Sequence, residues 1–460
     1  MKRRLLSAFL AVMMVLTMAP VAFAADETNT TSVGSYEELV NAIASAENGA
    51  TITVSGTIAI DAPLNITKSV TLKGDSIVPS ENFSGSCLVT LETAGATLTL
   101  GDIKLDAKQK GRVIVCTAGT LEIDGATITG GKAANSFIGG VYMTNSSELY
   151  MTSGFITGNV NGNTAYTSDN YLQYASDLWI GANASGVVEG GTVDNVFVNA
   201  NSYSANDQGA FAQAGGKVTN LYVEYAENQG ADVLYGGGTL ENLYISTIQG
   251  NGAYKKVTPV VGMEYHGGVT DDEAVAPVAK IGDTGYATLA AAVAAAADGA
   301  TITMLKNDTV TKEIDFTDKA ITLDLNGKII AGEFNDYYSV IEAQGENGSL
   351  TLTDTSADKA GKLASNKYGI SAADGGKLIV NSGTVEAEYA ALSGNNTAGD
   401  MNFEVNGGTL TSKQSEAIYM PGQQNLVVNG GVINGGISAR DGSDYCQQRR
   451  YQWYDHGSDS

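Results

Sequence analysis

Three similar segments near the C-terminal end constrain the fold of this chain more than any other feature. Residues 378–385, 403–410 and 426–433 each form an apolar strand pattern, pass through an Asn-Gly or Asn-Ser-Gly turn and continue into a second short strand. Their asparagines recur at steps of 25 and 23 residues. Repeats of this length are typical of solenoids and propellers, in which a unit buries its apolar face only against its neighbours. Because almost no helix separates the units, the pattern predicts an all-β chain wound as a parallel β-helix.

The asparagines form two series, and within each series they occupy the same position in consecutive repeats. Strands 193–198, 218–223 and 240–245 each carry an asparagine at the third position. Stacked asparagines bond to one another along such a stack and tolerate left-handed turns. We therefore predict structural ladders and leave open the alternative that these side chains bind cations or sugars. The ladder residues are Asn195, Asn220, Asn242, Asn381, Asn406 and Asn429.

The chain contains two copies of one design. Residues 35–54 align with residues 285–304 at an offset of 250, with identity at half of the positions. Each copy predicts a short amphipathic helix, and in the first copy Ser35 and Glu38 are spaced as a capping box. A solenoid needs a cap at its open end because exposed strand edges pair with other chains. The sequence thus predicts two tandem right-handed parallel β-helix domains, each capped by a short N-terminal α-helix.

Changes in composition predict where the parts of the chain begin and end. Residues 1–25 have the basic start, apolar run and small-residue cleavage site of a secretory signal peptide. The first domain covers 33–265 and the second covers 280–443, with a charged, proline-containing linker at 266–279. In segment 444–460, a one-base shift of the back-translated codons restores a coil-like sequence. We expect an out-of-frame or disordered tail there, and a C-terminus truncated by a frameshift.

The net charge restricts the partners of this chain. The formal charge is −24, and it becomes −27 when the signal peptide is removed with its three basic residues. Such an acidic chain repels nucleic acid and anionic lipid, so neither is an expected partner. Beyond the signal peptide no run approaches the ~18 apolar residues of a membrane-spanning helix. We expect a protein that is secreted or on the cell surface, without membrane insertion.

The coils, cap helix and asparagine series resemble the right-handed parallel β-helix proteins of the pectate-lyase-like superfamily. The closest likeness is to secreted or surface-attached, adhesin-like members from Gram-positive gut bacteria. Catalytic members of that superfamily are polysaccharide lyases, which use an Arg or Lys base with Ca²⁺-binding carboxylates, or polygalacturonase-like hydrolases. This resemblance implies the fold and raises polysaccharides as ligands, but its motifs do not specify an activity.

The motifs of the catalytic members do not recur in the coils. The only similar histidine segment is 265–268, and no Arg-x-Lys occurs. Asp102, Asp106 and Arg112 are the residues available for a lyase site, but their spacing is also that of loop residues that keep the surface soluble. We predict no catalytic residue, no metal ligand and no cofactor, and leave a Ca²⁺ requirement open. Cys87 and Cys116 are interpreted as small buried side chains, or alternatively as a disulfide between coils.

Aromatic residues gather in a long polar insertion between coils of the first domain. Loops that protrude from a rigid solenoid often carry function, and aromatic faces among Asn and Asp suit sugar rings. The alternative is that these rings only brace the loop. Segment 334–338 is a second aromatic candidate. The predicted ligand-binding residues are Tyr142, Tyr150, Tyr171, Tyr174 and Trp179.

These observations together favour an exported, non-catalytic adhesin or stalk that contacts glycans or host surface proteins. A polysaccharide lyase or glycoside hydrolase on the same fold is the first alternative. An inert structural component of a surface layer is the second.

Overall fold

The computed structural model describes the chain between residues 30 and 439 with short gaps. The described ranges are 30–134, 138–162, 176–200, 208–226, 229–246, 254–268, 276–394, 401–421 and 424–439. The predicted signal peptide (1–25) and tail (444–460) lie outside them. Internal contacts divide the chain into two units, Met1–Val275 and Ala276–Ser460. That boundary falls within the segment predicted to be a linker.

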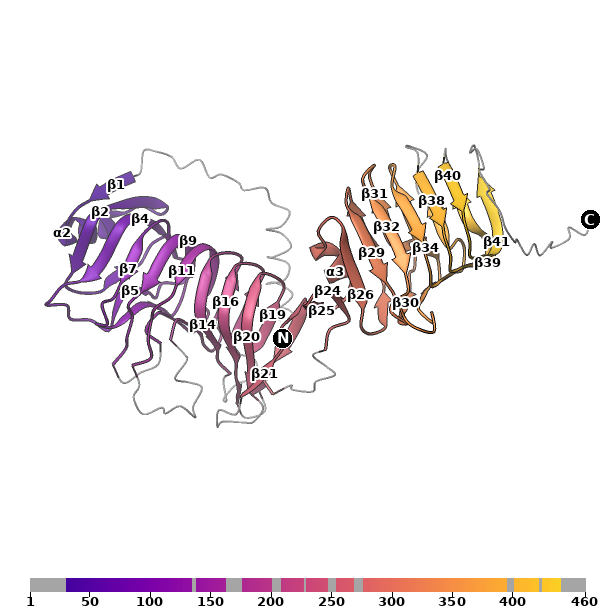
Figure 1. The fold of residues 1–460 in the computed structure, drawn as a ribbon. Helices are drawn as coiled ribbons and strands as arrows, with labels where there is room; N and C mark the ends of the chain where they lie inside the picture. The colour runs from indigo at the N-terminus through magenta and orange to yellow at the C-terminus, as the bar shows by residue number, and fades with distance from the viewer. Residues whose placement is uncertain are drawn as a thin grey trace, which may run out of the picture. The chain divides into compact units, whose positions relative to one another are not determined.

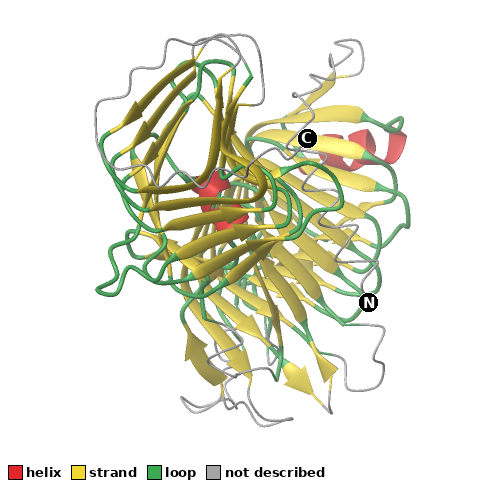
Figure 2. Ribbon diagram, turned by 90° about the vertical axis from the view of Figure 1, so that its right-hand side faces the viewer, coloured by secondary structure: helices red, strands yellow, loops and turns green. Residues whose placement is uncertain are grey.

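The predicted all-β fold class is confirmed (Figure 1). Parallel strands stack into a β-solenoid of about 14 turns, and the described residues contain two short α-helices, shown in red in Figure 2. Each coil contributes a strand to each of three stacks, which we name A, B and C in the first unit and D, E and F in the second. The stacks of each unit enclose its apolar core.

Stacks A, B and C are parallel throughout their length. Stack A runs through β1 (Thr30–Val33), β2 (Ala50–Ile60), β4 (Val70–Pro79), β6 (Thr97–Leu100), β9 (Thr120–Thr129), β11 (Glu148–Ile156), β13 (Ser185–Val188), β15 (Ala210–Gln213) and β19 (Asp232–Tyr235). Stack B contains the second halves of β2, β4, β9 and β11, with β7 (Lys104–Asp106), β14 (Thr192–Val198), β16 (Lys217–Val223) and β20 (Thr239–Ser246). Stack C contains β3 (Leu64–Ile66), β5 (Cys87–Leu91), β8 (Arg112–Cys116), β10 (Val141–Met143), β12 (Leu178–Ile180) and the second halves of β14, β16 and β20.

Antiparallel strands close the far end of the first unit. β21 (Tyr254–Val257) pairs with β20, and β23 (Met263–His266) pairs with β19. A small hairpin joins β17 (Tyr225–Ala226) to β18 (Gln229–Gly230), and β22 (Val260–Val261) lies between β21 and β23 in the chain. Reversing the strand direction interrupts the winding, so the last parallel edges of stacks A and C are covered.

The second unit repeats this plan after an antiparallel pair, β24 (Ala279–Ile281) with β25 (Thr284–Tyr286). Stack D contains β26 (Ala300–Met304), β29 (Ala320–Asp324), β32 (Ser349–Thr353), β35 (Lys377–Val380), β38 (Met401–Val405) and β40 (Gln424–Val428). Stack E contains β27 (Asp308–Val310), β30 (Ile329–Gly332), β33 (Lys362–Ser365), β36 (Thr384–Ala387) and the first parts of β39 (Thr409–Met420) and β41 (Val432–Ala439). Stack F contains β28 (Ile314–Thr317), β31 (Ser339–Gln344), β34 (Tyr368–Ala373), β37 (Leu392–Gly394) and the remainders of β39 and β41.

The inward side chains of each stack form a continuous apolar column. In stack A, Leu98 pairs in register with Leu121, Leu121 pairs with Leu149, and all three are buried. Neighbouring strands lie about 4.7–4.9 Å apart, so each side chain fills the space between those above and below it. Cys87 and Cys116 are buried as free thiols, as the first of the two interpretations had it.

A capped amphipathic helix lies near the start of each unit, after β1 in the first and after β25 in the second. In α2 (Tyr36–Ser45) the Ser35 hydroxyl accepts a hydrogen bond from the Glu38 N–H over 3.3 Å. The Glu38 carboxylate accepts from the Gly34 N–H over 2.8 Å, so the reciprocal bond reaches one residue further than the capping box predicts. In α3 (Leu289–Ala295) the preceding threonine hydroxyl performs the same capping role.

A lysine from the following coil closes the C-terminal end of each helix. Lys68 Nζ donates to the Ala46 carbonyl over 2.8 Å, and Lys319 Nζ donates to the Ala296 carbonyl over 2.9 Å. The last carbonyls of a helix have no partner within the helix and carry negative partial charge, so an ammonium group stabilises them. The two copies of the design therefore share this contact as well as their helix pattern.

Leu350→Ala tests the contribution of the apolar column. Leu350 is fully buried in stack D between Ile321 and Leu378 of the adjacent coils. We expect the free energy of unfolding of the second unit to fall by about 2–5 kcal/mol because a cavity replaces the side chain. Chemical denaturation followed by circular dichroism measures this loss. The matched control is Ile329→Ala, where the side chain is 43 % exposed, and its expected loss is below about 0.5 kcal/mol. Equal losses would contradict the role of the column.

Candidate functional site

The outer face of stack C carries a column of aromatic rings from consecutive coils. Tyr142 pairs in register with Trp179, Trp179 pairs with Phe197, and Tyr222 and Tyr244 continue the column. In that order, adjacent ring centroids are 6.3, 4.8, 6.2 and 4.9 Å apart, and every pair is stacked. A parallel ladder returns the same outward position to the same face in every coil, which aligns the rings.

Much of this aromatic column is buried. Phe197 is 0 % exposed and Tyr222 is 3 % exposed. Tyr254 packs against both of them, with centroid distances of 6.3 and 5.9 Å. At the other end, the Arg112 guanidinium lies 4.9 Å from the centre of the Tyr142 ring, a cation–π contact. These contacts favour the interpretation that rings on this face brace the solenoid.

An asparagine ladder runs along one edge of the aromatic column. The Asn242 amide donates to Asn220 Oδ1 over 3.0 Å, and the Asn220 amide donates to Asn195 Oδ1 over 3.0 Å. The Asn195 amide then donates to Asp177 Oδ2 over 2.8 Å and to the Ser176 hydroxyl over 3.0 Å. Burial raises the pKa of Asp177 although these donors oppose the shift. The ladder thus ends on the buried carboxyl group of Asp177, which accepts hydrogen bonds from Asn195, Ser176 and Asn159.

The second unit contains the other predicted asparagine series. The Asn429 amide donates to Asn406 Oδ1 over 2.7 Å, and the Asn406 amide donates to Asn381 Oδ1 over 3.0 Å. These side chains are exposed, in contrast to the half-buried series in the first unit. Each asparagine amide therefore donates its hydrogen bond to the side-chain oxygen of the asparagine in the adjacent coil.

Glu224 lies at the opposite edge of the aromatic column, at the end of β16. Its carboxylate accepts hydrogen bonds from the Ala200 N–H over 2.9 Å and from the Asn199 amide. Burial outweighs both donors and raises the pKa of Glu224 to about 7. Burial also raises the pKa of the nearby Tyr254 well above its usual value. This edge therefore holds a carboxyl group that titrates near neutral pH.

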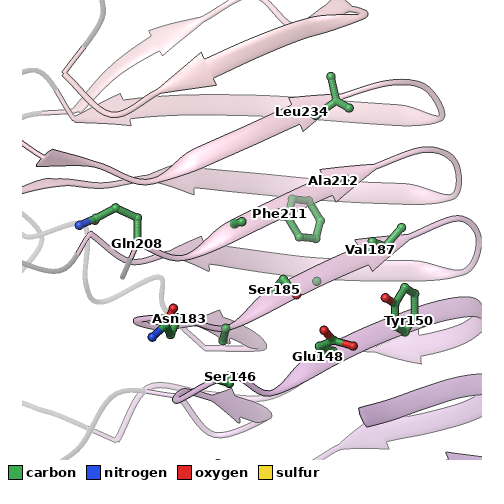
Figure 3. Close-up of a pocket in the computed structure, with 13 residues that line it drawn as sticks. Ser146, Glu148, Tyr150, Asn183, Ser185, Val187, Gln208, Phe211, Ala212 and Leu234 are labelled. Carbon is green, nitrogen blue, oxygen red and sulfur yellow. The ribbon is translucent and has the colours of Figure 1, made fainter. Parts of the chain in front are cut away.

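A cavity of about 370 Å³ lies on the outer face of stack A in the first unit (Figure 3). One outward side chain per coil forms a row along it: Tyr150, Val187, Ala212 and Leu234, which pair in register. The three aliphatic members are buried and Tyr150 is half-buried. The row gives the cavity an apolar wall with an aromatic ring at one end.

Polar side chains line the cavity beside this row. Glu148 pairs in register with Ser185, and each lies two positions before the row residue of its own strand, Tyr150 or Val187. Ser146 and Asn183 have left-handed φ angles of 67° and 62°, and the Ser146 N–H donates to the Asn183 carbonyl over 3.1 Å. The lining residues are Ser146, Glu148, Tyr150, Asn183, Ala184, Ser185, Gly186, Val187, Gln208, Ala210, Phe211, Ala212 and Leu234.

The electrostatics of the cavity keep the Tyr150 phenol neutral. Burial raises the pKa of Tyr150, and the negative charge of Glu148 raises it further. The hydroxyl is therefore protonated at physiological pH and can donate a hydrogen bond to a ligand. A ring face, a phenol donor and a carboxylate acceptor together can bind a ligand that has both apolar faces and hydroxyl groups.

The structure separates the predicted ligand-binding residues. Tyr142 and Trp179 lie together on stack C, whereas Tyr150 lies in the cavity on stack A. Tyr171 and Tyr174 lie outside the described residues. The reason for the separation is geometric, because each coil turns between its three strands and residues close in sequence emerge on different faces. Sequence reasoning missed Phe197 and Tyr222, although both stand two positions after a ladder asparagine.

Charged residues considered for catalysis have structural partners. Asp106 forms ion pairs with Lys104 over 3.2 Å and with Lys108 over 2.8 Å, and Arg112 stacks on the column described above. His266 bonds to Asp232 between β23 and β19, which raises the pKa of the imidazole. Within the described part of the chain, no group of three or more His, Cys, Asp or Glu is placed to hold a metal ion.

No protein-family model matches this chain, and no curated protein matches it. Among the described residues, no helix has both the length and the apolar character needed to cross a membrane.

Glu224→Gln tests whether burial raises the pKa of the Glu224 carboxyl group at the edge of the aromatic column. The pKa of Glu224 in the folded protein is above the ordinary value of 4.5, so the unfolded chain loses this proton at lower pH than the folded chain does. The stability of the fold that depends on protonated Glu224 is therefore fully present below pH 4.5 and is lost as pH rises through about 7. Relative to the wild type, the variant should gain about 1–3 kcal/mol of unfolding free energy between pH 5 and pH 8. Urea denaturation at both pH values measures the difference. Glu47→Gln, at an exposed position, should show no such gain, and a similar gain there would exclude the assignment.

Proposed function

We propose that this chain is an exported, cell-surface adhesin or stalk that binds an uncharged glycan without chemically altering it. The proposal includes membership of the pectate-lyase-like β-helix proteins found on Gram-positive gut bacteria. The single observation that carries the binding role is the cavity on stack A, where Tyr150 closes one end of an apolar row beside polar side chains.

The composition of the cavity favours a sugar as its ligand. Binding sites are mostly apolar hollows of about 300–1,000 Å³ with a few polar groups that orient the ligand. A sugar ring presents C–H groups to an aromatic face and hydroxyl groups to acceptors and donors. Here Tyr150 supplies the ring, while Glu148, Ser185 and Gln208 supply polar groups. The excess of acidic residues in the chain favours an uncharged glycan over an acidic one.

The cavity lining supports binding without chemistry. Glycoside hydrolysis uses two carboxyl groups on either side of the bond that breaks. Among the described lining residues, Glu148 is the one carboxyl group. A β-elimination would need a basic side chain beside the sugar, and the described lining has no Lys or Arg. Binding alone needs only the ring, the polar groups and the rigid strands that hold them.

Tyr150→Ala is the direct test of the binding site. The purified full chain is first screened against an array of neutral host and plant glycans, and a bound oligosaccharide is titrated by calorimetry. We expect the variant to lose at least about tenfold in affinity, because an aromatic anchor in a hollow carries much of the binding energy. Tyr150→Phe, which keeps the ring, should lose less. Tyr244→Ala, on stack C, is the matched control. Unchanged affinity in Tyr150→Ala would remove the cavity from consideration.

The absence of chemistry is tested separately with the same glycans and with polygalacturonate, because β-elimination requires a sugar that carries a carboxyl group. After prolonged incubation, with and without added Ca²⁺, we expect no new reducing ends and no ultraviolet-absorbing unsaturated sugars. Reducing ends without ultraviolet absorbance would indicate a hydrolase, and absorbance would indicate a lyase. Either product would contradict the proposal that the protein does not alter the glycan. The Tyr150 variants would still show whether the glycan binds in the cavity.

A further inference from the structure

The last described coil of the second unit has an unpaired outer edge. Within the described part of the chain, β40 pairs only with β38 and β41 pairs only with β39, and Figure 1 shows both at the end of the unit. In the first unit, by contrast, antiparallel strands cover the last parallel edges. The outer strand of a sheet has backbone N–H and C=O groups that can pair with another strand. We call the outer edges of β40 and β41, with their side chains, the open end.

Apolar side chains of the core are partly uncovered at the open end. Val428, Ile433 and Ile437 continue the inward columns of stacks D, E and F, and each is half-buried. Their in-register partners in the preceding coil are 0 % exposed, namely Val405, Leu410 and Ile418. A further coil would cover the exposed part of these columns, and removing that apolar surface from water favours its association.

The open end has none of the side chains that usually prevent strand edges from pairing. Natural proteins protect exposed edges with lysine, with proline or with charges that point inward. Residues 424–439 contain no charged residue and no proline, whereas β38 in the preceding coil contains Glu404. The outward valines Val427 and Val432 are 38 % and 49 % exposed. The composition of these strands therefore permits pairing with a further strand.

Asparagine side chains give the open end a direction. The Asn425 amide donates to Asn402 Oδ1 over 3.1 Å, and the Asn429 amide donates to Asn406 Oδ1 over 2.7 Å. Because each amide nitrogen faces the preceding coil, each Oδ1 atom lies on the side away from it. Neither Oδ1 accepts a hydrogen bond from the described residues. The open end therefore presents two acceptors, which match a strand that carries amide donors.

The turn after a ladder asparagine restricts what can stack on it. A Cβ atom at Gly407 would lie 2.5 Å from the Asn381 carbonyl oxygen, and one at Gly430 would lie 2.7 Å from the Asn406 carbonyl oxygen. Both distances are too short for a side chain, so glycine follows the asparagine wherever one ladder asparagine stacks on another. A strand that stacks on Asn429 in the same way needs glycine after its own asparagine.

We propose that the open end binds a strand of a separate polypeptide, which continues the solenoid in parallel register. The bound strand has apolar residues at alternate positions, followed by asparagine and glycine. Its apolar side chains cover Leu426 and Val428, and its asparagine amide donates to Asn429 Oδ1. Addition of a strand to an exposed edge is a common mode of peptide recognition, in which the register of the side chains supplies the specificity. This surface is in the second unit and does not depend on the cavity around Tyr150.

The bound strand comes from a different protein. In this chain, the segments with the required pattern all begin in strands of stack D, at 323–327, 403–407 and 426–430. Segment 440–460 contains no asparagine. A second copy of the chain would bring its own open end, so that asparagine oxygens of the two copies would meet as acceptor against acceptor. A partner with a similar repeat supplies the missing donors.

The test adds a fluorescently labelled peptide with the sequence of residues 401–420 to the full chain. Its second and sixth residues are asparagines that align with Asn425 and Asn429. Fluorescence polarisation should show saturable, one-to-one binding. A peptide with Asn406→Asp should bind at least about fivefold more weakly, because a carboxylate has no donor for Asn429 Oδ1. A peptide with Gly407→Val should lose measurable binding, as should a scrambled control.

Variants of the protein locate the bound peptide. Ile433→Lys should weaken binding about tenfold or more, because it places a charge where the peptide covers the apolar column. Ile329→Lys, at an exposed position of stack E, is the matched control and should bind as the wild type does. Thermal unfolding at the wild-type temperature shows that both variants keep the fold. With the wild-type protein, the peptide should slow amide hydrogen exchange in β40 and β41 and leave β29 unchanged.

Several results would overturn the proposal. They are the absence of peptide binding, equal binding of the Gly407→Val peptide, and unchanged hydrogen exchange in β40 and β41. Dimerisation of the full chain in sedimentation experiments, abolished by Ile433→Lys, would instead assign the open end to a second copy. The peptide measurements involve no glycan, so this proposal and the glycan site around Tyr150 can fail independently.

Discussion

Stacking of the same side-chain position in consecutive coils is the interaction on which the rest of the structure depends. Leu98, Leu121 and Leu149 lie one above another, and no single coil could bury any of them alone. The same register acts on the outside of the coil. It joins Asn195, Asn220 and Asn242 into a ladder, and it aligns aromatic rings along stack C. Core, ladder and aromatic column are three results of one periodicity.

Features that depend on local periodicity were predictable from the sequence. The β-solenoid fold followed from strand patterns and from turns that recur at nearly constant steps, because strand spacing ties the repeat length to the coil. The cap helices followed from apolar spacing and from Ser35. The contacts of Lys68 and Lys319 with the helix carbonyls were not predictable, since they join segments more than twenty residues apart. No repeat pattern marks a lysine as the partner of a carbonyl.

The candidate sites were harder to predict because function depends on the face from which a side chain emerges. Tyr142 and Tyr150 are eight residues apart, yet they belong to stacks C and A. The turn between β10 and β11 decides this, and its shape is not evident from composition. Exposure is equally hidden in the sequence. Phe197 and Tyr337 both stand in aromatic groups, but only the second remains open to solvent.

These differences give aromatic residues three distinct roles on one scaffold. Rings on stack C pack against each other and against Tyr254, where they contribute to stability. Tyr150 forms the end of a hollow among aliphatic and polar side chains. Tyr337, Tyr368 and Tyr389 gather at the corner between stacks E and F, with ring centroids 5.3–6.4 Å apart. A solenoid can vary its turns without disturbing its core, so recognition and folding place few demands on the same residues.

The hydrogen bonds from Lys68 and Lys319 to the ends of the cap helices also affect the order in which the coils fold. Lys68 and Lys319 each come from the coil that follows their helix, so the contact that completes each cap helix forms only after that coil has folded. Every later turn closes a loop of similar, modest length, so the entropic barrier to adding a turn does not grow with the size of the solenoid. Two such starting points in one polypeptide allow winding to nucleate separately in each half, with the early half assembling while the later half is still being synthesised.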